Sequence, residues 1–291
     1  MPAVTTHIEC AKDIYDSLPL GKQIVINNKN MFYLGAQGPD LFYFYKLGVP
    51  SRLNQIGNYL HNNQIYNVIK YMDEYVKRSG NYNLLNYYYG YLCHYALDSE
   101  VHPLVFQRSR YGNLGDEPEL VIHYRIEAFI DKYMLNKKNR TIKSFDAHKL
   151  IQISKEEREQ LAKMYVSLFK DVLGLTVEQE KIEKSCRDMV RALIILKPNS
   201  KIKYNAIQNY ETLSGKDHTI SSLMLYNDFD NVDYVLNNDR HEFVNIDDDS
   251  LVYNDSFDDL YEKAIKKAVK LITEPLAKEN FKLNFRGSIS E

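Results

Sequence analysis

Three histidines and two carboxylates occur in the first half of the chain at spacings typical of a metal site. His94, Asp98 and His102 follow one another at intervals of four residues, and His123 and Glu127 are also four apart. Residues four apart lie on the same face of a helix, one turn above the other. Two facing helices with such pairs could enclose metal ions in mixed nitrogen and oxygen coordination, which suits zinc. The sequence therefore predicts a metalloenzyme.

Three more polar residues, His7, Asp40 and His61, lie earlier in the chain among apolar neighbours. A single histidine on an apolar helix face is usually a core residue with satisfied hydrogen bonds, so a purely structural polar network is the alternative interpretation. Burying several carboxylates without compensation costs several kcal/mol each, and bound cations provide that compensation. The whole set therefore favours a site for several metal ions.

The order of residues along the two predicted helices indicates how the ions would be shared. His94 and Asp98 can bind one ion side by side. Pro103 disfavours helical geometry at His102, so we expect the helix to end there. His102 would then bind a neighbouring ion together with His123 and Glu127. Asp98 lies between the two groups, in the position of a bridging carboxylate.

The elements that must position these residues are predicted to be helices. Apolar residues recur with helical periodicity, and capping residues, glycine or proline mark most of the ends. The predicted helices are one capped by Thr6 and ended by Pro19, then 27–34, 52–77 with an interruption near Gly57, 82 to about 100, 118–135, two that begin at the capping boxes Ser154–Glu157 and Thr176–Gln179, the second ending near Pro198, and a last one at 257–273.

Between these helices the chain has a loop rich in glycine and proline at 35–40 and a segment without clear periodicity at 199–254. No strand pair is indicated. We therefore expect an all-α fold with one multi-helix domain over 1–291. In this interpretation 1–135 forms the metal-binding core, and 136–291 adds supporting helices.

Composition excludes several classes of protein. Charged residues make up 26% and hydrophobic residues 44%, as in an ordinary globular protein, and the net charge of −2 argues against nucleic acid as a partner. Three cysteines indicate a reducing compartment rather than a disulfide framework. The sequence has no signal peptide and no apolar run near the ~20 residues of a membrane span, so we expect a cytoplasmic protein.

These motifs together resemble the zinc-dependent phospholipase C family, whose all-helical fold is shared with the S1/P1 nucleases. The matching residues follow the family's order and fall within the first 130 or so positions. They are Thr6-His7 with Ala11, the loop Gly35-Ala-Gln-Gly-Pro-Asp40, His61, His94-x-x-x-Asp98, His102-Pro103 and His123-x-x-x-Glu127. One His-x-x-x-Asp pair is weak evidence, whereas the ordered set is specific.

Carried over position by position, the resemblance implies three zinc sites. The sets are His102, His123 and Glu127 for one ion, Asp40, His61, His94 and Asp98 for a second, and His7 with Asp98 for the third. Secreted members of the family also bind the third ion through a processed N-terminal tryptophan. This chain contains no tryptophan, so two to three zinc ions are predicted.

The function expected from these sites is zinc-dependent hydrolysis of a phosphate ester, most simply by a phospholipase C-like phosphodiesterase that uses metal-activated water. Asp40 is the candidate general base, with the alternative that it is a metal ligand only. The substrate is a phosphate ester, with phospholipid as one possibility. The aromatic run at 42–45 could line a substrate cleft, although core packing is favoured.

Three other functions remain as alternatives. An S1/P1-type nuclease would use the same metals, but the chain has no basic groove signal. An HD-type phosphohydrolase is also helical, but it needs an adjacent His-Asp pair, which this sequence lacks. A non-catalytic metal-binding protein is less favoured, because all eight expected ligand side chains are present.

Overall fold

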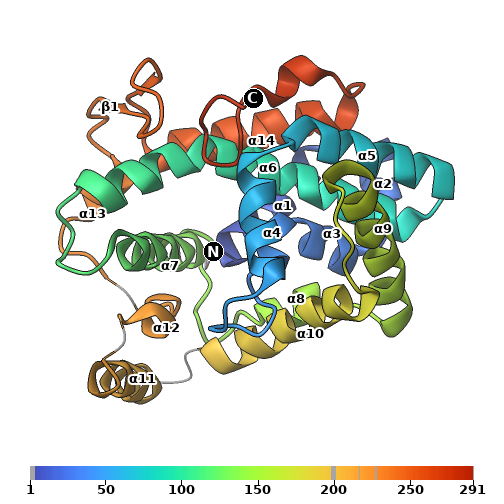
Figure 1. Ribbon diagram of the computed structural model, residues 1–291. Coiled ribbons are helices and arrows are strands. Elements are labelled where there is room, and N and C mark those ends of the chain that lie inside the picture. Colours follow the sequence, from blue (N-terminus) through green and yellow to red (C-terminus); the bar gives the residue numbers. More distant parts are fainter. Residues whose placement is uncertain (1–3, 198–200, 216, 227, 291) are drawn as a thin grey trace.

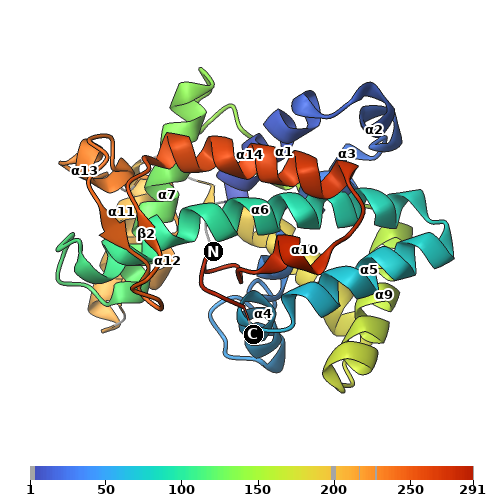
Figure 2. The same ribbon diagram turned by 90° about the horizontal axis from the view of Figure 1, so that it is seen from above.

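The long helix α6 (Tyr82–Tyr111) is the central element of the fold, and α14 (Phe257–Thr273) runs alongside it (Figures 1 and 2). The computed structural model describes residues 4–197, 201–215, 217–226 and 228–290. The main partners of α6 are α1 (Val4–Ser17), α3 (Lys29–Gly35), α7 (Glu119–Lys137) and α14. Aromatic residues keep α6 apolar on several faces, as a buried helix requires, with Tyr87, Tyr91 and Tyr95 fully buried.

The other elements surround this central helix. They are α2 (Leu20–Val25), the 3₁₀ helix η1 (Gly38–Phe42), α4 (Arg52–Asn62), α5 (Ile65–Ser79), α8 (Ala147–Ile151), α9 (Lys155–Leu173), α10 (Gln179–Leu196), α11 (Lys201–Leu213), α12 (Thr219–Ser222), α13 (Val232–Leu236), strands β1 (Phe243–Val244) and β2 (Val252–Tyr253), and the 3₁₀ helix η2 (Lys278–Phe281). Strands β1 and β2 form a short antiparallel pair. The predicted all-α class is confirmed, and no helix among the described residues is both long and apolar enough to cross a membrane.

Helices α3 and α6 pack with their backbones in direct contact. A methyl group on Gly90 would overlap the carbonyl oxygen of Phe32, and one on Gly35 would overlap the carbonyl oxygen of Tyr87. Both positions therefore require glycine because only hydrogen fits between the two helices. This close approach also brings the carbonyl of Ala36 to the ring of His94 on α6, at 3.2 Å from Nδ1.

We expect Gly90→Ala to lower the free energy of unfolding by about 3 kcal/mol, since the added methyl must push α3 and α6 apart. Urea unfolding of the two proteins measures the difference. Gly21→Ala is the matched control, because a Cβ at Gly21 meets no atom within 4 Å. Equal stabilities of the Gly90 variant and the wild type would contradict the direct helix contact.

The prediction that a helix ends at His102 is wrong, because α6 continues through Pro103 to Tyr111. Proline removes one backbone hydrogen bond and costs helix stability. Here tertiary packing overrides that cost, since Leu104 and Val105 beyond the proline are buried and Gly287 lies against the proline ring. As a result, His102 remains on the same helix face as the two predicted ligands that precede it.

Two other predicted boundaries are confirmed. Ser154 caps α9 with a capping box, and the amphipathic helix predicted at 257–273 is α14. The predicted helix end at Pro198 lies outside the described residues, and α10 is described to Leu196. Much of the segment predicted to be irregular, 199–254, forms α11, α12, α13 and the strand pair in its described part.

Three helix signals are wrong in position. Thr176 does not cap a helix, because the chain stays extended while Val177 enters the core, and α10 begins at Gln179. The break expected near Gly57 occurs instead at Gln64, whose left-handed backbone separates α4 from α5. Thr6 lies inside the first turn of α1 and not at its cap.

Candidate metal centre

Five of the eight predicted ligands lie on the facing sides of α6 and α7. On α6, Nε2 of His94 is 3.1 Å from Oδ2 of Asp98, and Nδ1 of His102 is 3.6 Å from the same oxygen. On α7, Nε2 of His123 is 3.2 Å from Oε1 of Glu127. The two helices meet where Nε2 of His102 lies 3.3 Å from that Glu127 oxygen. The spacing of four residues thus places these side chains as the sequence predicts.

The other three residues come from elements earlier in the chain. α1 places Nε2 of His7 3.2 Å from Oδ1 of Asp98, and the rings of His7 and His94 stack at 4.3 Å. α4 and η1 bring Nε2 of His61 to 3.1 Å from Oδ1 of Asp40. All eight predicted residues therefore gather in one cluster, called the eight-residue cluster below.

Within the eight-residue cluster, nitrogen and oxygen atoms form three groups whose members lie within 4.8 Å of one another. The groups are His7, His94 and Asp98; Asp40, His61 and His94; and His102, His123 and Glu127. Zinc bonds of 2.0–2.1 Å in a tetrahedron put ligand atoms about 3.3 Å apart. The spacings of 3.1–3.3 Å across the closest pairs are of that size.

Backbone carbonyls orient three of the imidazole rings from behind. Nδ1–H of His61 donates to the carbonyl of Gly57 at 2.7 Å, and that of His102 donates to Phe285 at 2.6 Å. The Nδ1 atom of His94 faces the Ala36 carbonyl. With Nδ1 used as a donor, Nε2 of each ring is left as an acceptor toward the interior of the cluster, which is the tautomer a metal ligand needs.

The donor set fits metal cations. Nε2 of His94 is buried and makes no hydrogen bond within the described part of the chain, although it lies 3.1 Å from a carboxylate oxygen. Among the described residues, no lysine or arginine forms an ion pair with Asp40 or Asp98, both of which are buried. Bound cations would satisfy both the free nitrogen and the buried negative charge.

A sequence profile described as zinc dependent phospholipase C matches residues 6–176, which is more than half of the chain. The chain belongs to the zinc-dependent phospholipase C family. No curated protein and no solved structure matches it. The matched region contains all eight residues of the cluster, so the family assignment and the geometry concern the same site.

The charges within the eight-residue cluster of this zinc-dependent phospholipase C family member influence one another. Burial alone would raise the pKa of Asp98, but His102, His94 and His7 hold that pKa well below its usual value. Burial would lower the pKa of His102, yet Asp98 and Glu127 raise it to about 9. Burial lowers the pKa of His94, which favours the neutral imidazole that a metal ion requires.

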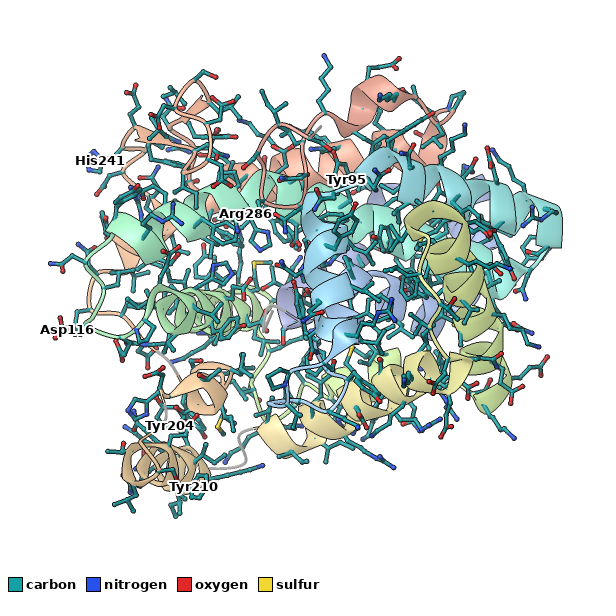
Figure 3. All side chains as sticks on the ribbon, in the orientation of Figure 1. Tyr95, Asp116, Tyr204, Tyr210, His241 and Arg286 are labelled. Carbon is teal, nitrogen blue, oxygen red and sulfur yellow. The ribbon has the colours of Figure 1, made fainter. Side chains whose placement is uncertain are left out.

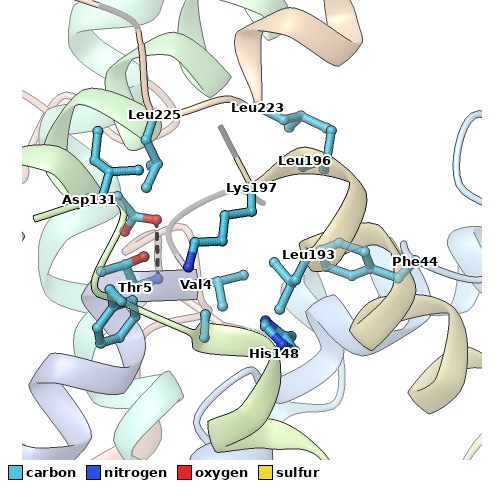
Figure 4. Close-up of a pocket in the computed structure, with 13 residues that line it drawn as sticks. Val4, Thr5, Phe44, Asp131, His148, Leu193, Leu196, Lys197, Leu223 and Leu225 are labelled. Atoms are coloured by element: carbon cyan, nitrogen blue, oxygen red, sulfur yellow. Dashed lines mark hydrogen bonds between the residues drawn. The ribbon is translucent and has the colours of Figure 1, made fainter. Parts of the chain in front are cut away.

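Helix α1, which carries His7, is held to α7 by a buried carboxylate. Asp131 accepts hydrogen bonds from the backbone N–H groups of Thr5 and Thr6, at 3.1 and 2.7 Å, and from the Thr6 hydroxyl at 2.6 Å. Figure 4 shows the Thr5 bond at the edge of a mainly apolar pocket beside the start of α1. The described residues that line this pocket include no member of the eight-residue cluster. Asp131 thus satisfies donors at the first turn of the helix.

We expect Asp131→Ala to lower the free energy of unfolding by about 2 kcal/mol, because it leaves these buried donors without a partner. The variant should also weaken metal binding at the group that contains His7. Thermal unfolding and zinc titration measure the two effects. Asp16→Ala, at an exposed carboxylate on the same helix, is the control for loss of charge. An unchanged affinity for every metal ion would show that Asp131 does not position His7.

Sequence reasoning missed the contribution of the C-terminal segment 282–290. Phe285 is buried, and its ring centroid lies 5.2 Å from that of His61 and 5.4 Å from that of His94. Its N–H donates to the His61 carbonyl, while its own carbonyl accepts from His102. Figure 2 shows this segment beside α4. No residue type or spacing in the segment signals a metal site, so the sequence could not reveal this role.

A cleft opens from the eight-residue cluster to the surface. The residues that line it are Asp40, Tyr43, Asn58, His61, Asn62, His102, Phe106, Glu119, Leu120, His123, Tyr124 and Arg286. Of the aromatic run at 42–45, only Tyr43 lines this cleft, while Phe42 and Phe44 are buried in the core. The cleft therefore combines the proposed metal ligands with aromatic walls suited to an organic substituent.

Proposed function

We propose that the chain is a zinc-dependent hydrolase of phosphate esters, most simply a phospholipase C-like phosphodiesterase. The observation that carries this proposal is the opening of a buried cluster of five histidines and three carboxylates into a cleft. Membership of the zinc-dependent phospholipase C family supports zinc as the metal. A structural cluster would not need an opening to solvent, whereas a catalytic one must admit its substrate.

In this proposal, three sets of residues hold two to three zinc ions. The sets are His102, His123 and Glu127; Asp40, His61, His94 and Asp98; and His7 with Asp98. Bound zinc would lower the pKa of a water molecule and offset negative charge on the phosphoryl oxygens. The described geometry supports sharing between sites, because Asp98 has one oxygen near His7 and the other near His94.

Asp40 is proposed as the general base. Its carboxylate lies in the cleft lining, where an attacking water could reach it, and Oδ1 is 3.1 Å from Nε2 of His61. The alternative role, metal ligand only, makes a different prediction for Asp40→Asn. Asp40 would hold zinc in either role, so the two roles differ once excess zinc has refilled the site of Asp40→Asn. Loss of the base would keep kcat low at full zinc content, whereas a ligand-only role would let kcat recover with the zinc content.

The cleft supports a phosphate ester with an apolar or aromatic part as substrate. Tyr43, Phe106, Leu120 and Tyr124 provide walls that could contact an acyl chain or another organic group. A nuclease of the S1/P1 type would use the same metals. It is the weaker proposal, because the described residues that line the cleft include one arginine and no lysine, too few cations to follow a nucleic acid backbone.

The test is the replacement of a ligand from the α6–α7 group. We expect His123→Ala or Glu127→Ala to lose about one metal ion per chain and most activity on a panel of phosphodiesters. Elemental mass spectrometry of protein purified without chelator or histidine tag gives the metal content. His241→Ala, at an exposed histidine outside the cluster, is the control. Full metal content and full activity in the two ligand variants would exclude the proposal.

A further inference from the structure

Arg286 is the one lysine or arginine among the described residues that line the cleft. It belongs to the C-terminal segment 282–290, beyond the region matched by the family profile, and it lies beside α6 (Figure 3). The other charged side chain at the cleft outside the eight-residue cluster, Glu119, is already paired with Arg110 at 3.1 Å. Within the described part of the chain, Arg286 is thus the one permanently charged cation among the residues that line this opening.

The guanidinium of Arg286 is held in place from two sides. Its Nε and Nη2 donate to the two carboxylate oxygens of Asp247, at 3.0 and 3.4 Å, and its carbon atom Cζ lies 4.0 Å from the centroid of Phe106. Asp247 is in turn fixed by the hydroxyl of Ser288 at 2.9 Å. An arginine fixed by a carboxylate and an aromatic face has lost most of its rotamer freedom before any ligand binds.

This arrangement leaves hydrogen-bond donors free at the cleft. A guanidinium has five N–H groups, and Asp247 engages two of the three nitrogens. Nη1 makes no hydrogen bond to any residue that the structure describes. Asp247 does not line the cleft, so it supports Arg286 from outside and leaves the opening clear.

The contacts of the Phe106 ring limit how far the Arg286 guanidinium can lie from the eight-residue cluster. The Phe106 ring lies 4.6 Å from the ring of His123 and 5.3 Å from that of His102. Because Cζ of Arg286 is 4.0 Å from the same Phe106 centroid, it lies less than 10 Å from the centroids of both histidine rings. A group bonded next to a metal-bound phosphate would reach that distance, whereas the phosphate itself would be held by the cluster.

We propose that Arg286 is a binding subsite for a second negatively charged group, next to the phosphate that is hydrolysed. The proposal rests on the function proposed above and narrows its substrate class. The substrates would be phosphodiesters in which the substituent that stays bonded to phosphorus after hydrolysis carries a negative charge. An anionic substituent gains charge-assisted hydrogen bonds from the free donors of Arg286. A cationic head group at the same place would be repelled.

The experiment compares two p-nitrophenyl phosphodiesters of nearly the same shape that differ in this charge, one carrying glycolate and the other glycolamide. In the zinc-loaded wild type, we expect kcat/KM to be about 10-fold higher for the glycolate diester. Arg286→Gln should bring the ratio close to one, and Arg286→Lys should keep part of it. Because the ratio is the readout, a general loss of activity or stability does not imitate the effect.

Arg240→Gln is the matched control. Arg240 makes the same two-bond pair, with Asp259 at 2.9 and 3.0 Å, but it is exposed and does not line the cleft. Its removal should leave the ratio unchanged. Equal kcat/KM for both diesters in the wild type, or an unchanged ratio in Arg286→Gln, would overturn the subsite.

A binding measurement separates this proposal from the proposed function. Titration calorimetry of zinc-loaded protein with 2-phosphoglycolate and with inorganic phosphate gives a ratio of Kd values without any reaction. Tighter binding of 2-phosphoglycolate that disappears in Arg286→Gln supports the subsite even if neither diester is hydrolysed, in which case the hydrolase proposal fails. Hydrolysis without discrimination leaves the hydrolase and overturns the subsite. Equal kcat/KM values for the two diesters, together with equal Kd values for 2-phosphoglycolate and phosphate, also overturn the subsite.

Discussion

Asp98→Asn is expected to release about two metal ions per chain and to lower kcat/KM by about 1000-fold or more. Asp98 is the residue on which the cluster converges, with His7 near one oxygen, His94 near the other and His102 within 3.6 Å. Asparagine keeps the shape of the side chain but removes its charge and one acceptor. A loss of metal ions from Asp98→Asn would therefore show that the ions share the charge of Asp98, because the packing of the side chain is unchanged.

Elemental mass spectrometry and phosphodiester hydrolysis measure the two effects on Asp98→Asn. The same substitution at the exposed Asp239 controls for loss of one negative charge. Loss of a single ion would show that Asp98 belongs to one site only. A full complement of metal would show that the carboxylate of Asp98 is not a ligand.

Phe285→Ala is expected to lower the free energy of unfolding by about 3–5 kcal/mol and metal affinity by about 10- to 100-fold. The ring is almost completely buried against the imidazoles of His61 and His94. Its removal leaves a cavity directly behind two proposed ligands. The backbone that accepts the His102 hydrogen bond would lose its anchor at the same time.

Phe281→Ala separates the two consequences of the Phe285 substitution. Phe281 is similarly buried, but among the residues that the structure describes its ring stacks near Tyr66 and Tyr95 and near no histidine. We expect a similar loss of stability in urea unfolding, with zinc affinity unchanged in a competition titration against a chelator. Equal zinc affinities in the two variants would contradict a role of Phe285 in supporting the metal site.

The sequence predicted the site best where residues able to bind a metal ion recur at the helical period. His94, Asp98 and His102 could be placed on one face because their interval of four residues matches the helical turn, and the same rule placed His123 one turn from Glu127 on one face of the next helix. Helical period does not show how far α6 extends. The end predicted before Pro103 is wrong because long-range packing outweighs the local preference of proline.

The part of the site that could not be predicted is built from backbone and from an irregular segment. The carbonyls of Gly57 and Phe285 orient histidines, and any residue type offers a carbonyl. Arg286 reaches the cleft because Asn284, Asn245 and Ser288 hydrogen-bond within and between two loops. Such contacts depend on tertiary structure, so a single sequence gives no periodic or compositional signal for them.

The hydrogen bond from His102 to Phe285 joins residues 183 positions apart, which has a consequence for biosynthesis. While the ribosome is still adding the last helices, His102 has no partner for Nδ1 and the faces of His61 and His94 are uncovered. Closing so long a loop is slow relative to forming the local helices. We therefore expect a nascent chain to carry an incomplete, weakly binding centre, and tight zinc uptake to follow translation of the C-terminal segment.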